Sequence, residues 1–215
     1  MKIKRLKIIQ KHLFIALFII FLYQSRARAQ HLDINLLRDL NLGRNEYYDN
    51  AHKVLSKSVT PMVLAGPLIV YSIGMLHKNC SQKQKGLYVA ETILGATILS
   101  AGLKYSFGRE RPFITYPDID NLMNPTSPSF PSGHTTKAFA LATSISWAFP
   151  KWYVVFPAFA WAGAVGYSRI HLGVHYPSDV LMGAIVGTGS AFLSHQLNRW
   201  INTKTKKKML FDGIE

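Results

Sequence analysis

Two histidines, one aspartate and several cations recur in three short motifs of the chain, and together they could break a phosphate ester bond. The motifs read KYSFGRERP at Lys104–Pro112, PSGH at Pro131–His134 and SRIHLGVHYPSD at Ser168–Asp179. Arginine and lysine bind phosphate oxygens, and a histidine acts as a nucleophile or as a proton donor. The three motifs therefore hold enough groups to bind a phosphate and cleave its ester bond without a metal.

The third motif places His175 four residues before Asp179. If a helix begins at Tyr176 or Pro177, both side chains lie in or near its first turn, within contact distance. A carboxylate there accepts the N–H of one imidazole nitrogen and leaves the other nitrogen free as a nucleophile or base. Arg169 adds a cation suited to bidentate contact with phosphate. Taken alone, the spacing also fits a helix-capping aspartate beside a surface histidine.

The second motif predicts a turn that leads into a helix. Ser132 offers a hydroxyl group, and the backbone N–H groups of Ser132, Gly133 and His134 lie at the predicted helix start, where anions bind. His134 is placed to donate a proton to a leaving oxygen. Taken alone, the same residues fit a simple helix N-cap.

The first motif ends a predicted helix with three cations, Lys104, Arg109 and Arg111. Taken alone, cations at such a boundary also fit contacts with lipid headgroups. Lys104 lies within apolar sequence, where an unpaired charge is costly, so we expect it to have an anionic partner. Arg109 is expected to be a peripheral phosphate contact or a structural residue.

The composition favours a membrane protein over a nucleic-acid-binding protein. The 215 residues include 25 Lys+Arg and 11 Asp+Glu, a net charge of +14, yet 48% are hydrophobic. The cations are concentrated in short segments between apolar runs, as in membrane proteins, so we expect no nucleic acid as a partner. The single cysteine, Cys80, excludes an intrachain disulfide and a multi-cysteine metal site.

Residues 1–29 predict a targeting segment, either a cleaved signal peptide or a retained signal anchor. Five cations precede an apolar run of 11 residues at Leu13–Tyr23, and Ala27–Ala29 offers a cleavage site. That run is shorter than the roughly 20 residues that span a bilayer. Either interpretation sends residue 30 onward to the outside of the cytoplasmic membrane.

The remaining chain predicts an all-α fold, a polytopic transmembrane helical bundle with about five spans. We expect an extracytoplasmic amphipathic segment at 30–58, a membrane domain at 59–198 and a basic cytoplasmic tail at 199–215. The alternative is a soluble all-α domain with buried helices. The apolar segments that predict the spans are 59–76, 86–107, 135–149, 152–167 and 180–197.

The charges of the short loops predict how this bundle is oriented. With the N-terminus inside, the basic loop at His77–Lys85, the turn at Lys151 and the basic tail all face the cytoplasm, as the positive-inside rule requires. The three motifs then fall in outer loops. We therefore expect a multi-pass protein of the bacterial inner (cytoplasmic) membrane, with its active site at the extracytoplasmic face, toward the periplasm.

The order and spacing of the motifs, K-x6-R-P, P-S-G-H and S-R-x5-H-x3-D, resemble the signature of the type-2 phosphatidic acid phosphatase superfamily. The match covers Lys104–Asp179 directly. The resemblance implies a metal-independent phosphatase that needs no cofactor, with His175 as the nucleophile that forms a phosphohistidine. It implies that Asp179 orients His175 and that His134 protonates the leaving group and then assists water. The phosphate-binding residues that it implies are Lys104, Arg111, Ser132, Gly133 and Arg169.

The resemblance further implies an integral membrane enzyme that hydrolyses a lipid phosphate monoester or diphosphate in the outer leaflet. We favour lipid A (lipopolysaccharide) as the substrate, because a compact chain with an export-type N-terminus suits an outer-leaflet lipid. Undecaprenyl diphosphate and phosphatidylglycerophosphate are the alternatives, as is a soluble periplasmic acid phosphatase of the same superfamily. The loops at 31–58 and 113–130 are expected to recognise the headgroup, and the sequence indicates no oligomeric state.

Overall fold

The computed structural model describes residues 30–212 and the side chains of residues 30–201, and its regular structure over that range is helical throughout, without a β-strand. The all-α prediction is therefore confirmed. The predicted targeting segment at 1–29 lies outside the described residues. A helix over residues 30–41 comes first. It is followed by η1 (Glu46–Tyr48), α2 (Asp49–Lys57), α3 (Val59–Leu76), α4 (Cys80–Phe107), α5 (Pro112–Thr115), α6 (Gly133–Ala148), α7 (Trp152–His171) and α8 (Pro177–Asp212).

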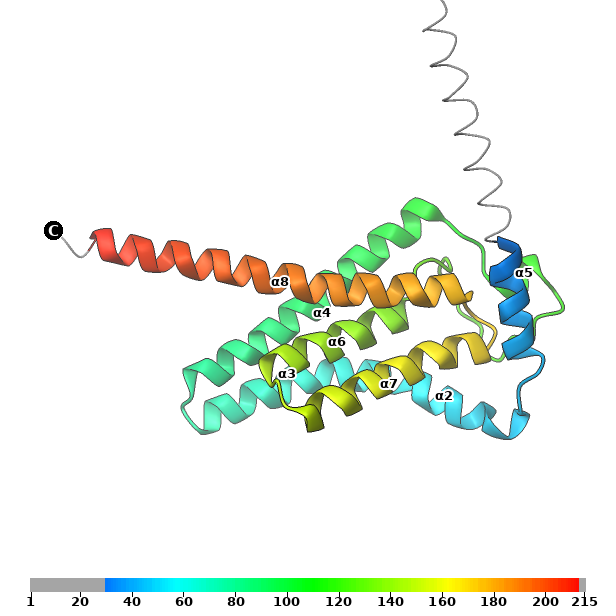
Figure 1. Cartoon of the computed structure of the whole chain (residues 1–215), viewed down its shortest axis with the longest axis horizontal. Helices are drawn as coiled ribbons and strands as arrows, with labels where there is room; N and C mark the ends of the chain where they lie inside the picture. The colour runs from blue at the N-terminus through cyan, green and yellow to red at the C-terminus, as the bar shows by residue number, and fades with distance from the viewer. Residues whose placement is uncertain (1–29, 213–215) are drawn as a thin grey trace, which may run out of the picture.

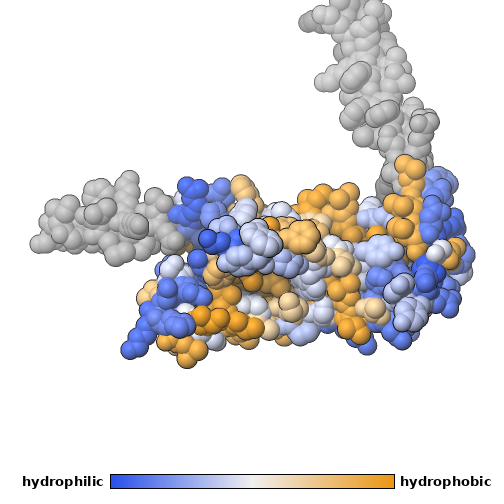
Figure 2. Space-filling model, turned by 60° about the horizontal axis from the view of Figure 1, so that its bottom comes forward, coloured by the Kyte–Doolittle hydropathy of each residue, from blue (hydrophilic) through white to orange (hydrophobic). Residues whose placement is uncertain are grey.

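Helices α3, α4, α6, α7 and α8 coincide with the five predicted apolar segments. Within the described part of the chain, three stretches are long and apolar enough to cross a membrane, namely Glu46–Leu76, Cys80–Thr115 and Pro177–Ile201. Helix α8 continues through most of the expected basic tail, to Asp212. Hydrophobic side chains spread over the body of the bundle, and hydrophilic side chains gather toward its two ends (Figure 2). The number of spans stays a prediction.

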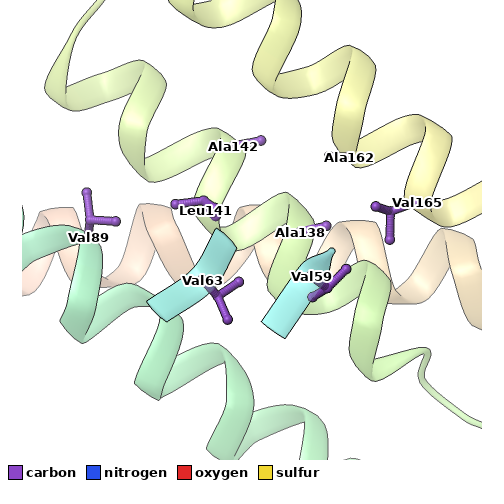
Figure 3. Packing of buried hydrophobic residues seen from close by; sticks show 8 residues of the cluster. All are labelled: Val59, Val63, Val89, Ala138, Leu141, Ala142, Ala162 and Val165. Carbon is purple, nitrogen blue, oxygen red and sulfur yellow. The ribbon is translucent and has the colours of Figure 1, made fainter. Parts of the chain in front are cut away.

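Small aliphatic side chains from four helices form the centre of the bundle. Apolar packing of this kind lets helices approach closely, because few large side chains separate them. The cluster holds α3, α4, α6 and α7 together around α6 (Figure 3). Its buried members are Val59, Val63, Val89, Ala138, Leu141, Ala142, Ala162 and Val165.

Helices α6 and α8 approach each other so closely that only glycine fits between them. A Cβ atom added at Gly187 would lie 2.3 Å from the carbonyl oxygen of Thr136, and one at Gly183 would lie 2.8 Å from that of Ser132. Real side chains do not tolerate these distances. The close packing fixes the start of α6, which carries the second motif, against α8, which begins within the third motif.

The long helices alternate in direction, so the helix ends that carry the three motifs meet at one end of the bundle (Figure 1). The end of α4 carries the first motif, the start of α6 the second, and the junction of α7 and α8 the third. Residues far apart in the sequence are thereby brought into one site.

The helix over residues 30–41 covers this end of the bundle. Its residues Ile34 and Leu37 are buried in a second apolar cluster with Ile119, Ile170 and Tyr176. The expected amphipathic segment therefore packs against the elements that carry the motifs.

The loop between α7 and α8 is held by a polar contact with this covering helix. The Asn41 side chain donates hydrogen bonds to the carbonyl oxygens of His171, at 2.9 Å, and Asp120, at 3.2 Å. The backbone passes this point at Gly173, which has a φ of +69°. A Cβ atom there would lie 2.1 Å from the carbonyl oxygen of Asp120, so glycine is required for the turn that leads to His175.

Candidate active site

The predicted pair of His175 and Asp179 is present, and a serine that the sequence analysis missed joins it. The Nδ1 atom of His175 lies 3.5 Å from Oδ2 of Asp179. The hydroxyl group of Ser129 lies 2.5 Å from the same Oδ2 and 3.3 Å from Nδ1, so it bridges the two side chains. Asp179 also accepts the backbone N–H of Tyr176, at 3.1 Å. These contacts fix the carboxylate beside one nitrogen of the imidazole.

His175 is neutral in this environment. Its side chain is 1% exposed, and burial lowers the pKa of His175 to about 3, although the hydrogen bond and charge of Asp179 act in the opposite direction. A neutral imidazole has a lone pair on one nitrogen, which is the form that a nucleophile requires. The site therefore keeps His175 ready for attack at neutral pH.

Arg111 lies at the other ring nitrogen of His175. Its Nη1 atom is 3.3 Å from Nε2 of the ring and donates to the carbonyl oxygen of Val174 at 2.7 Å. Its Nε and Nη2 atoms donate to the backbone oxygen and the hydroxyl group of Ser127, at 2.8 and 3.3 Å. The guanidinium is therefore held rigidly beside the nucleophile, where a phosphate oxygen would bind.

Lys104 has backbone partners rather than the anionic partner that we expected from its apolar surroundings. Its ammonium group donates to the carbonyl oxygens of Pro128, at 2.5 Å, and Ser129, at 3.4 Å. The prediction of an anionic partner is wrong because the loop before α6 folds its carbonyl groups over the end of α4. A Cβ atom added at Gly133 would lie 3.5 Å from Cε of Lys104, so Lys104 and Gly133 lie side by side as the motifs predict.

Arg169 is the largest fully buried side chain among the described residues, with 2% of its surface exposed. Its Nη1 atom donates to the hydroxyl group of Ser56 and approaches the sulfur of Met123. Its Nε atom has no hydrogen-bond partner within the described part of the chain. A buried guanidinium with a donor to spare suits an anionic ligand. Ser56 comes from α2, and the sequence analysis did not assign it to the site.

The second motif lies at the start of α6, but not all of its predicted donors are free. The N–H of Ser132 donates to the carbonyl oxygen of Asp179 at 3.0 Å, and its hydroxyl group accepts from Thr135 at 2.8 Å. The expectation that the Ser132 N–H binds an anion is therefore wrong, because this group joins α6 to α8. The N–H groups of Gly133 and His134 lie in the open first turn, where no helical partner exists.

Burial lowers the pKa of His134 to about 3, and the charges of Arg169 and His175 act in the same direction. His134 is therefore neutral in the free site, and the negative charge of a bound phosphate would favour its protonation. The side chain is partly exposed, and no hydrogen bond to its ring occurs within residues 30–201. It is therefore available to a bound substrate, as a proton donor to the leaving oxygen must be.

Arg109 makes structural contacts, which decides between the two roles that the sequence left open. Its guanidinium forms ion pairs with Asp179 and Asp33, each at 2.7 Å. His171, four residues before His175, contacts a different carboxylate, since its Nε2 atom lies 2.8 Å from Oδ1 of Asp49. Within residues 30–201, no group of three or more histidine, cysteine, aspartate or glutamate side chains could hold a metal ion.

The arrangement as a whole can transfer a phosphoryl group to His175. Arg111 lies beside Nε2, and Lys104 and Arg169 lie close enough to Arg111 for their charges to interact with it. Together the three cations would neutralise the charge of a phosphate. Asp179 and Ser129 support the opposite nitrogen, and His134 stands as the separate acid. Sequence reasoning missed Ser129 and Ser56, for which the motif spacing gave no signal.

Comparison with known proteins finds one matching family and several similar proteins. The family model described as "PAP2 superfamily" matches residues 85–203. An undecaprenyl-diphosphatase from Sulfolobus acidocaldarius is 32% identical over 126 residues, which is 58% of this chain. The chain spans only 61% of the length of that relative.

Two further similarities extend over more of the chain. A lipid A 4'-phosphatase from Bacteroides thetaiotaomicron is 27% identical over 188 residues, covering 81% of this chain and 82% of the relative. The crystal structure of the transmembrane PAP2-type phosphatidylglycerolphosphate phosphatase from Bacillus subtilis superposes with a TM-score of 0.69 at 25% identity. The superposition covers 87% of this chain and 96% of that structure.

Proposed function

Because the chain belongs to the PAP2 superfamily, we propose that it is a membrane phosphatase that hydrolyses a lipid phosphate monoester or diphosphate through a phosphohistidine intermediate. The observation that carries this proposal is the placement of His175, with Arg111 at Nε2 and with Ser129 and Asp179 at Nδ1. A buried neutral histidine between a phosphate-binding cation and a carboxylate suits nucleophilic attack on phosphorus.

The first half of the reaction forms a bond between Nε2 of His175 and phosphorus while the bond from phosphorus to the leaving oxygen breaks. His134 takes up a proton when the anionic phosphate binds beside it and then gives that proton to the leaving oxygen, so the product leaves as an alcohol or as a protonated phosphate. The ring of His175 gains positive charge, which Asp179 stabilises through the Nδ1–H. Lys104, Arg111 and Arg169 hold the oxygens of the transferred group.

The second half of the reaction returns the enzyme to its starting state. His134, now neutral, accepts a proton from water as the water oxygen attacks phosphorus. The bond between phosphorus and Nε2 breaks, inorganic phosphate leaves and His134 is protonated again. All bonds and protons balance without a metal ion or a cofactor.

Lipid A is the substrate that we favour, and the relative from Bacteroides thetaiotaomicron supports this choice. That protein, described as a lipid A 4'-phosphatase, matches this chain over four fifths of both sequences. Undecaprenyl diphosphate is the second candidate, because the relative from Sulfolobus acidocaldarius is more similar in sequence, at 32% identity, over a shorter segment.

The location that we propose for the active site is the periplasmic face of the bacterial inner membrane. The basic loop at His77–Lys85 and the basic tail support this orientation, because both lie at the ends of helices opposite to the motifs. The substrate would then lie in the outer leaflet, with its phosphate at the end of the bundle that the helix over residues 30–41 covers.

Phosphate release from a panel of purified lipids tests the proposal. The full chain in detergent micelles would be incubated with lipid A, undecaprenyl diphosphate, phosphatidylglycerophosphate and phosphatidate. We expect rapid release from lipid A and slower release from the other lipids. Release from no member of the panel would contradict the proposed function, and a preference for undecaprenyl diphosphate would replace lipid A as the substrate.

A further inference from the structure

The helix over residues 30–41 contributes a carboxylate that reaches the catalytic pair through one arginine. The Nη2 atom of Arg109 lies 2.7 Å from Oδ2 of Asp33, and its Nη1 atom lies 2.7 Å from Oδ1 of Asp179. The guanidinium also lies over the ring of Tyr176, with its carbon 3.9 Å from the ring centre. One rigid, planar group therefore connects Asp33 with the carboxylate that supports His175.

Asp33 also holds the start of the helix that carries Asp179. Its Oδ1 atom accepts the backbone N–H of Ser178 at 2.9 Å, and its Oδ2 atom accepts the Ser178 hydroxyl at 2.5 Å. A carboxylate that accepts an N–H of the first helical turn acts as an N-cap, in this case from a distant part of the chain. Asp33 therefore fixes both the position of α8 and the orientation of Arg109.

The charges in this network have a direct consequence for His175. Arg109 shares its positive charge between two carboxylates at equal distances. Without the charge of Asp33, Arg109 would pair with Asp179 alone and would draw electron density from it. Asp179 would then stabilise the positive charge that develops on His175 less well, and the first chemical step would slow.

We propose that Asp33 and Arg109 are positioning residues for the pair of His175 and Asp179, so that the helix over residues 30–41 is part of the catalytic site. This inference rests on the proposed function. It concerns a segment outside residues 85–203, which the family model covers. Neither residue is among those that we assign to phosphate binding, and both act through Asp179.

A second ion pair on the same helix provides a matched control. Arg38 donates to Asp118 at 2.7 and 3.2 Å, and this pair is exposed, away from the catalytic residues. The variant D118N weakens the docking of the helix without changing the charges near Asp179. The variant D33N removes the charge of Asp33, while the asparagine oxygen still accepts the N–H of Ser178.

The experiment measures phosphate release and phosphohistidine formation for both variants in the full-length protein, with the lipid that the wild type hydrolyses fastest. We expect D33N to lower kcat and the rate of phosphohistidine formation by about tenfold, the effect of losing one charged hydrogen bond, with KM within about twofold. We expect D118N to match the wild type. Equal rates for D33N and the wild type, or equal losses in D33N and D118N, would overturn the inference.

A double variant separates the action through Arg109 from a general effect on folding. If Asp33 acts through Arg109, the variant D33N/R109M is expected to be no slower than R109M alone. If instead the loss of kcat in the double variant equals the product of the losses in the two single variants, the inference is overturned.

If D33N does not accumulate in membranes, R109K replaces it in the experiment. We expect the same fall in kcat for R109K, and an unchanged kcat would overturn the inference. If the wild type releases phosphate and D33N releases it at the same rate, only this inference is overturned. If the wild type itself releases no phosphate, the proposed function is overturned as well.

Discussion

The Nη1 atom of Arg111 lies 3.3 Å from Nε2 of His175. Arginine carries only donors, so Nε2 must be the nitrogen with the lone pair, and the proton of the neutral ring must sit on Nδ1. The Nδ1–H then points to Ser129 and Asp179, which are both acceptors. Arg111 therefore selects the tautomer in which the nucleophilic nitrogen faces the phosphate-binding cations.

Replacing Arg111 with lysine should abolish most of the activity although the charge is kept. A lysine cannot contact Val174, Ser127 and His175 at once, as the planar guanidinium does. We expect R111K to lower kcat by about 100-fold, because a preorganised donor to the transition state is lost. The exposed Arg38 provides the control, and R38K should retain kcat within about twofold. Activity of R111K close to that of the wild type would contradict the role of Arg111.

The variant S129A should slow catalysis without weakening substrate binding. The hydroxyl group of Ser129 bridges Asp179 and His175, and it does not belong to any of the three motifs. We expect kcat to fall by about tenfold, as one hydrogen bond to a charged group is lost, and KM to stay unchanged. Steady-state kinetics would measure both, with S106A as the control, because the Ser106 hydroxyl bonds only within α4. A rise in KM at constant kcat would argue against this role.

The buried His175 should make the protein less stable in acid. Its pKa is about 3 in the folded state and about 6.5 in an unfolded chain, so the unfolded state binds more protons between these values. The free energy of unfolding should therefore fall as the pH drops below 6.5, by at most about 1.4 kcal/mol per pH unit from this residue. The variant H175N lacks this penalty.

Thermal unfolding in detergent at pH 7.5 and pH 5.5 would measure the effect. We expect the Tm of the wild type to fall relative to that of H175N between the two pH values. A difference in Tm that does not change with pH would show that His175 is not buried in its neutral form.

Because α6 and α8 are in close contact, we predict that Gly187 tolerates no side chain, whereas Gly189 does. A Cβ atom at Gly187 would lie 2.3 Å from the Thr136 carbonyl oxygen, whereas nothing lies within 4 Å of one at Gly189. We expect G187A to cost about 1–3 kcal/mol of stability and to lower kcat, because α8 must move away from α6. The variant G189A should leave the Tm and kcat unchanged. Equal stability of the two variants would contradict the packing described for these helices.

The helices and the catalytic core could be predicted from the sequence because both leave local signals. Apolar runs of helical length mark the long helices, and the spacing of His175 and Asp179 places both in or near the first turn of one helix. The alternating direction of the helices then brings His134 to the same end. Predicting these features requires only the local geometry of the chain and the rule that consecutive spans alternate in direction.

The supporting residues could not be predicted because their partners lie far away in the sequence. Asp33 contacts Ser178 across 145 residues, and Ser56 contacts Arg169 across 113. The sequence around Asp33 and Ser56 does not distinguish either residue from an ordinary surface residue. The backbone partners of Lys104 were missed for a related reason, since they depend on how the loop before α6 folds back over α4.

The most direct test of the account is to trap the phosphohistidine at His175. The full chain would react with lipid substrate labelled with ³²P at the phosphate, in buffer that contains EDTA, and would be quenched in base, where phosphohistidine survives. We predict label on His175 in the wild type, none in H175A, and unchanged turnover in EDTA. Turnover by H175A, or turnover by the wild type that stops in EDTA, would contradict the metal-free mechanism through His175.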